Sequence, residues 1–117
     1  MAYTILNRGS TAVAKGSVIL FSAFENEGPM WVGQGPREER RRVEYGLTFL
    51  VPPMVHVGLS MWDVSNEANM RMQVAAEEVG NSGFVVSLRT WGDTRIARMG
   101  VSWLAVGMVT DPDLWDV

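Results

Sequence analysis

The sequence predicts an all-β fold, a single antiparallel sandwich or small barrel. Its length of 117 residues falls within the usual size of one domain, so we expect one core. A hydrophobic content of 47%, with only 20% charged residues, is too apolar for a disordered chain. Several short segments of alternating polarity are separated by glycine- and proline-containing turns, which is the pattern of short antiparallel strands.

The first predicted strand covers Ser17–Phe24, where apolar residues occupy both faces, as in a strand buried on both sides or at an oligomer contact. Residues 28–42 follow, rich first in glycine and proline and then in charge, and they predict a long loop. From Val43 to Val51 every second residue is apolar, which predicts a strand with one buried face. Pro52 and Pro53 end it because proline cannot donate to a ladder.

The second half of the chain carries the clearest strand signals. Met54–Trp62 alternates, with four apolar residues on one face and His56 and Ser60 on the other. Gly80–Gly83 is a turn signal, and two final apolar strands within Gly83–Gly107 surround the Gly92-Asp93 turn. That turn displays Trp91, Asp93 and Arg95, and an aromatic ring beside charged side chains is typical of a site for a small polar ligand such as a sugar.

One segment has two interpretations. Ser65–Val79 contains strong helix formers, begins with a serine that could cap a helix and stops at Gly80, so its propensity favours a helix. As a strand, it would place Met70, Met72, Val74 and Ala76 inward and the residues between them outward. The neighbouring strand signals favour the strand, because a helix here would leave a sheet edge unpaired.

Composition and charge exclude several function classes. A formal net charge of -3 gives no reason to expect nucleic acid or an anionic membrane as partner. With no cysteine, one histidine and no phosphate-binding glycine loop or nucleophile elbow, no set of catalytic roles can be assembled. We therefore expect a protein that is not an enzyme and uses no metal or cofactor. The charged run Arg37–Arg42 is interpreted as an ion-pair network.

The motifs of the chain, taken together, resemble the H-type lectin domain, the family of the snail agglutinins and of the C-terminal domain of discoidins. The resemblance spans about Ser17–Gly107. It rests on Phe49, Pro52-Pro53, Val55, Val57-Gly58-Leu59-Ser60, Trp62-Asp63-Val64, Ala68-Asn69, Arg71, Gly83-Phe84, Thr90-Trp91, Asp93-Thr94 and Ser102-Trp103. It implies a six-stranded antiparallel β-sandwich that trimerises and binds galactose- or N-acetylgalactosamine-like sugars between protomers. It also implies that Ser65–Val79 is a loop followed by a strand.

Three site residues carry over from the resemblance. The family's arginine in its N-x-R motif matches Arg71, its stacking tryptophan matches Trp91, and an acidic loop residue matches Glu38. A guanidinium and a carboxylate can bind sugar hydroxyls with charge-assisted strength, and an indole can cover the apolar face of a pyranose. The sequence departs from the family at Gly92, a histidine in the snail agglutinins, and at Ala97, where a nearby aromatic falls.

Two hypotheses for function follow. In the first, the chain is a trimeric lectin-like module for cell-surface glycan or polysaccharide, acting as the adhesion subunit of a phage-like particle. In the second, it is a structural or decoration subunit whose sugar pocket is vestigial. The predicted organisation is an N-terminal arm (1–16) that could dock to a larger particle or fibre, a lectin-like domain (17–109) and an acidic tail (110–117). With no signal peptide or membrane insertion predicted, we expect cytoplasmic synthesis and action outside the cell on a released particle.

Overall fold

The computed structural model describes residues 2–5, 11–22 and 28–110. These residues form seven strands and one short helix. The elements are β1 (Ala2–Ile5), β2 (Thr11–Ser22), α1 (Pro29–Val32), β3 (Arg37–Glu44), β4 (Met54–Val64), β5 (Met72–Glu77), β6 (Gly83–Thr90) and β7 (Ile96–Met108). The fold is all-β and antiparallel, as the sequence predicts. Within the described ranges, no helix has the length and apolar character needed to cross a membrane.

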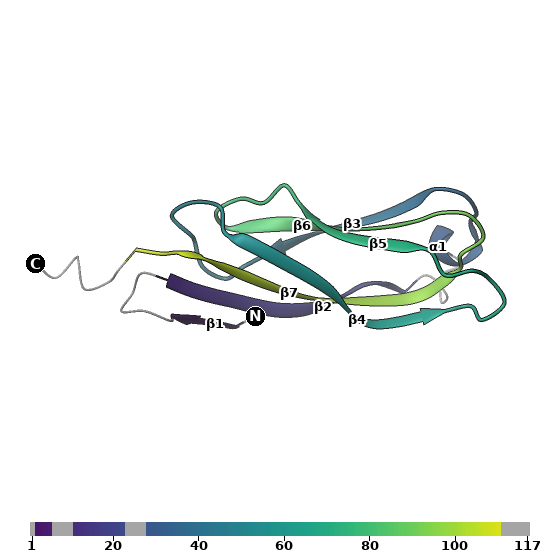
Figure 1. Cartoon of the computed structure of the whole chain (residues 1–117), viewed down its shortest axis with the longest axis horizontal. Coiled ribbons are helices and arrows are strands. Elements are labelled where there is room, and N and C mark those ends of the chain that lie inside the picture. The colour runs from purple at the N-terminus through teal and green to yellow at the C-terminus, as the bar shows by residue number, and fades with distance from the viewer. Residues whose placement is uncertain (1, 6–10, 23–27, 111–117) are drawn as a thin grey trace, which may run out of the picture.

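The strands form two facing sheets (Figure 1). One has the order β1-β2-β7-β4 and the other the order β3-β6-β5. Without β1, each sheet has three strands, which matches the six-stranded sandwich expected. β1 adds to the edge of the first sheet by pairing with β2, from Ala2 opposite Lys15 to Ile5 opposite Ala12.

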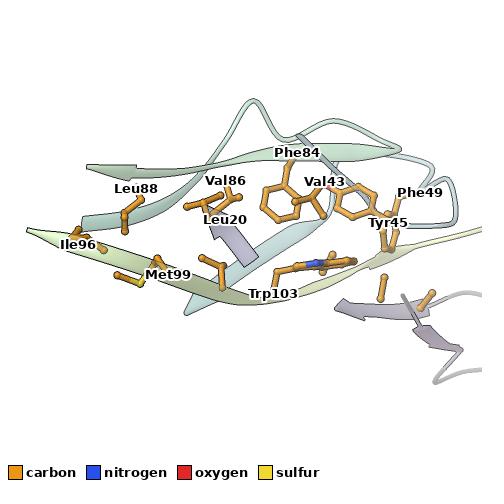
Figure 2. Packing of buried hydrophobic residues seen from close by; sticks show 14 of the residues in the cluster. Leu20, Val43, Tyr45, Phe49, Phe84, Val86, Leu88, Ile96, Met99 and Trp103 are labelled. Atoms are coloured by element: carbon orange, nitrogen blue, oxygen red, sulfur yellow. The ribbon is translucent and has the colours of Figure 1, made fainter. Parts of the chain in front are cut away.

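The core lies between the sheets and contains a cluster of four aromatic rings (Figure 2). Tyr45 lies 5.2 Å from Phe49, 5.9 Å from Phe84 and 6.0 Å from Trp103, measured between ring centroids. Trp103 is 4% exposed. Its indole lies over Gly16 on the neighbouring strand, where an added Cβ would be 2.9 Å from the ring.

The strand predicted for Val43–Val51 is wrong, and so is the loop predicted for the charged run before it. Arg37–Glu44 forms β3, which pairs along its length with β6. After it the chain turns at Gly46, whose φ is 88°, and residues 45–51 form a loop. Tyr45 and Phe49 are buried from this loop, so alternate residues are apolar without a strand.

Ser65–Val79, for which the sequence allowed a helix or a strand, forms a loop followed by β5, as the resemblance implies. Met72, Val74 and Ala76 pack against the core, as the strand interpretation predicts. Met70 precedes the strand and is 58% exposed, so its predicted inward position is wrong. β2 begins at Thr11, earlier than predicted, and Phe24 lies outside the described residues.

Candidate functional site

Three segments meet at one end of the sheet β3-β6-β5. Arg37 at the start of β3 and Met72 at the start of β5 both pair with Thr90, the last residue of β6. Pro36, Arg71 and Trp91 are the next residues beyond these pairs, and they therefore lie at the same end of the sheet. β6 and β7 belong to different sheets, so the connection that carries Trp91 crosses the end of the sandwich, beside α1 (Figure 1).

A hollow of about 400 Å³ opens at this end. It is lined by Pro36, Arg37, Glu38, Arg89, Thr90 and Trp91. The indole of Trp91 is 44% exposed. The structure therefore brings together two of the predicted site residues, Glu38 and Trp91, on the outer face of the three-stranded sheet.

Glu38 is held by two arginines. Its Oε2 lies 2.6 Å from Arg89 Nε, and its Oε1 lies 3.9 Å from Arg40 Nη1. The same arginines bind Glu77, with Arg89 Nη2 at 2.9 Å and Arg40 Nη1 at 3.1 Å. The Ser87 hydroxyl donates to Glu77, and this bond, helped by the two arginines and opposed by desolvation, lowers the pKa of Glu77. The ion-pair network predicted for the charged run is confirmed for Glu38, Arg40 and Arg42, whereas Arg37 and Arg41 donate to backbone carbonyls.

Arg71, the third predicted residue, lies on the other side of Trp91. Its Nη1 is 2.7 Å from Asp93 Oδ1. Its backbone is fixed by two threonines, because its N–H donates to Thr94 Oγ1 at 2.9 Å and its carbonyl accepts from the Thr90 hydroxyl. Desolvation would raise the pKa of Asp93, but hydrogen bonds from Asn69 and Arg71 lower it below its ordinary value.

Gly92 explains how Arg71 reaches Asp93. Its φ is 70°, in the left-handed region, and an added Cβ would lie 3.2 Å from Arg71 Nη1. The guanidinium thus packs over the bare backbone of Gly92. The Cβ of a histidine at this position would be in close contact with the Arg71 guanidinium.

Other predicted neighbours do not reach the site. Arg95 turns away, with its guanidinium 4.4 Å from the centroid of the Trp31 ring and its Nε donating to the Trp31 carbonyl at 3.0 Å. Ala97, at the family's aromatic position, is 5% exposed within β7. The ranges that the structure describes contain no group of three or more His, Asp or Glu residues that could hold a metal ion.

Arg89 and Arg37 line the hollow but were not predicted as site residues from the sequence. Arg89 could have been found, because it lies two residues before Trp91 on the same strand and period two places both on one face. Arg37 gives no such signal, since its partners among the described residues are backbone carbonyls, which no sequence pattern marks.

An antiparallel β-sandwich with an exposed indole and paired charges at one end defines a binding protein. The chain belongs to the H-type lectin domain family, whose model matches residues 40–106, and the predicted resemblance is confirmed. Membership implies carbohydrate binding, and the family is typically non-enzymatic.

The chain is also similar to individual proteins. The fold is similar to that of recombinant discoidin II of Dictyostelium discoideum, with a TM-score of 0.71 and 25% identity over 84% of this chain and 37% of that chain. Wild-type discoidin II gives a TM-score of 0.71 at 24% identity, over 90% of this chain and 40% of that chain. The chain thus spans well under half of discoidin II. A Fuscovulum blasticum protein described as "ATP synthase subunits region ORF 7" is 48% identical over 108 residues, 92% of this chain and 94% of its own length.

Proposed function

We propose that the end of the sandwich around Trp91 is a carbohydrate site through which the chain binds cell-surface glycan or polysaccharide. We call it the Trp91 corner, made of residues 36–38, 69–71 and 89–93. The observation that carries the proposal is the exposed indole of Trp91 beside a hollow that also contains a carboxylate and a guanidinium. A flat apolar ring beside hydrogen-bonding groups matches a pyranose, which has an apolar C–H face and a polar rim.

Each predicted residue has a role in this proposal. Trp91 stacks on the sugar ring. Arg71 uses only Nη1 to bind a described side chain, Asp93, so its Nη2 and Nε can donate to adjacent hydroxyls. Glu38 keeps acceptor capacity beyond its bonds to arginine, because a carboxylate has about four lone-pair directions.

The charges of the corner favour an uncharged sugar. Arg71 is paired with Asp93, and Arg89 is shared by Glu38 and Glu77. These groups amount to three carboxylates against two guanidinium groups, so an acidic sugar would add a further negative charge beside Glu38. The family's galactose-like sugars fit this requirement, and Gly92 and Ala97 remove two contacts on which selectivity for N-acetylgalactosamine would depend.

We further propose that the module acts as a homotrimer. The outer face of the four-stranded sheet exposes four large apolar side chains, which a monomer would leave in water. They are Ile19, Met54, Leu104 and Met108. Three weak sites on one trimer would gain avidity on a surface that repeats the same sugar. A released phage-like particle that must find its host cell, with the N-terminal arm as the docking segment, is the setting we propose for such adhesion.

A second candidate function is a structural or decoration subunit whose pocket is unused. The observation in its favour is that Glu38 and Arg71 already form ion pairs within the chain. Such a site is stable without a ligand.

A glycan array that includes bacterial capsular and lipopolysaccharide sugars separates the two candidates. The native protein, Trp91→Ala and Trp62→Ala should be applied side by side. Trp62 is a matched control, because it is 54% exposed on β4 and outside the corner. We expect saturable binding that Trp91→Ala loses and Trp62→Ala keeps. Equal binding by native protein and Trp91→Ala would contradict the proposed site, and absence of binding across the array would favour the structural subunit.

A further inference from the structure

Arg37 joins three separate segments of the chain through one guanidinium. Its Nε donates to the carbonyl of Gly35 at 2.9 Å. Its Nη1 donates to the carbonyls of Pro29 and Met30 in α1, each at 3.3 Å. Its Nη2 donates to the carbonyl of Gly92 at 3.2 Å. The start of β3, the helix α1 and the connection after β6 therefore meet at this side chain.

The bond to Gly92 stabilises the connection between β6 and β7, which lies outside the sheet ladders. Residues 91–95 lie between β6 and β7 and belong to neither strand. The Gly92 carbonyl also accepts the backbone N–H of Gly35 at 2.9 Å. The Gly92 carbonyl thus accepts two bonds, from the Gly35 N–H and from Arg37 Nη2, which hold the turn after Trp91 against the segment that leads into β3.

The geometry of this contact requires arginine. Carbonyl groups that lie in different directions can be reached together only by a planar group with several fixed donors. A lysine ammonium at the same position could reach one or two of them. Among the described residues no ion pair links Arg37 to a carboxylate, and burial lowers the pKa of its guanidinium. Its contribution is therefore hydrogen bonding by a charged donor, with the bonds to Gly35 and Met30 partly buried and the bonds to Pro29 and Gly92 exposed.

We propose that Arg37 is a positioning residue that holds the Trp91–Gly92 turn against Pro36 and Glu38 and so keeps the hollow open for the sugar. The inference rests on the proposed function for its effect on affinity. Its effect on the turn itself does not require a ligand. Arg37 lines the hollow, but four of its five N–H donors are occupied by backbone, so it acts through the turn.

The test compares Arg37→Lys with Arg41→Lys. Arg41 is a matched control on the same strand, because its Nη1 donates to one carbonyl, that of Ile19, at 2.8 Å, away from the corner. Amide hydrogen exchange of Gly35 reports the bond to Gly92, and the indole N–H resonance of Trp91, assigned with Trp91→Phe, reports the ring. For Arg37→Lys we expect Gly35 exchange about tenfold faster, a shifted or broadened Trp91 resonance, and about tenfold weaker affinity for a sugar identified on the array. Arg41→Lys should change none of these.

Two results would overturn the inference. In one, Arg37→Lys leaves both the Gly35 exchange rate and the Trp91 resonance as in the native protein. In the other, both change while the affinity for a bound sugar stays the same. If the native protein binds no sugar, the proposed function fails by itself and the first two measurements still decide whether Arg37 holds the turn. If Arg37→Lys does not fold, the native protein gives the answer: Arg37 Nη2–H, which donates to the Gly92 carbonyl, should exchange more slowly than Arg42 Nη2–H, since Arg42 binds Glu44 through Nε. In that case, equal rates would overturn the inference.

Discussion

Replacing Gly92 by alanine should destabilise the protein and weaken sugar binding together. The φ of Gly92 is 70°, and a left-handed conformation costs a residue with a Cβ about 1–2 kcal/mol. Alanine also lowers the conformational entropy of the unfolded chain, which stabilises the folded protein by about 0.4–1 kcal/mol. The added Cβ would lie 3.2 Å from Arg71 Nη1, so the guanidinium must also shift away from its exposed partner Asp93. The expected net loss from the backbone alone is about 0.5–1 kcal/mol.

Two other glycines separate the causes of this loss. Gly35 has a φ of 76° and open space around an added Cβ, so Gly35→Ala carries only the backbone strain. Gly58 has open space and no positive φ, so Gly58→Ala should stabilise the strand by about 0.5–1 kcal/mol. The order of stability should be Gly58→Ala, native, Gly35→Ala and Gly92→Ala.

Thermal unfolding followed by circular dichroism measures this order. For a chain of this length, 1 kcal/mol corresponds to about 4 °C in the midpoint. Sugar affinity, measured by calorimetry, should fall for Gly92→Ala because Arg71 is displaced. If Gly92→Ala is as stable as Gly58→Ala and binds sugar as well as the native protein, the packing of Arg71 over Gly92 is refuted.

Three further predictions follow from the core, the ion-pair network and the exposed face. Gly16→Ala should cost about 1–3 kcal/mol by overpacking, because the Cβ would lie 2.9 Å from the Trp103 ring; a denaturant midpoint equal to that of the native protein would contradict this. The lowered pKa of Glu77 means that its stabilising contribution is present above the unfolded-state pKa and is lost as the pH falls through the folded-state value. Ser87→Ala removes the largest cause, so carbon NMR titration should give a higher pKa for Glu77, and an unchanged value would exclude that hydrogen bond. Leu104→Glu should dissociate the proposed trimer in light scattering with the fold retained, whereas a native protein that is already monomeric would rule out the trimer.

Alternating apolar and polar residues predicted β4, β6 and β7 correctly, but this pattern missed β3 and predicted a false strand after it. Met54–Trp62 lies within β4, and both strands predicted within Gly83–Gly107 are present. β3 was missed because every residue before Val43 is charged, on both faces of the strand, so it shows no apolar period. The false strand after it arose because Tyr45 and Phe49 are buried from a loop. The bonds that fix this loop, from these residues to the carbonyls of Ser82 and Asn81, are far apart in sequence.

For the site, the sequence could indicate residue types but not their partners. Glu38 and Trp91 share the predicted location because the β3–β6 register places Glu38 opposite Arg89, two residues before Trp91. Asp93 was predicted to be displayed beside Trp91, and it lies there as the partner of Arg71. Arg95 was predicted beside it as well, but its side chain is taken by Trp31 on α1. No local pattern encodes that contact, because it depends on how α1 packs.

The position of the site follows from the topology of the sandwich. Since β6 and β7 lie in different sheets, their connection must cross the gap between the sheets and cannot close as a hairpin. It is therefore held by contacts outside a ladder: Arg37 and Gly35 donate to its Gly92 carbonyl, and its Thr94 hydroxyl accepts the backbone N–H of Arg71. A connection held in this way can change its exposed residues while the strands keep their register. Gly92 and Asp93 are such residues, and their contacts with Arg71 shape this corner outside the ladders of the two sheets.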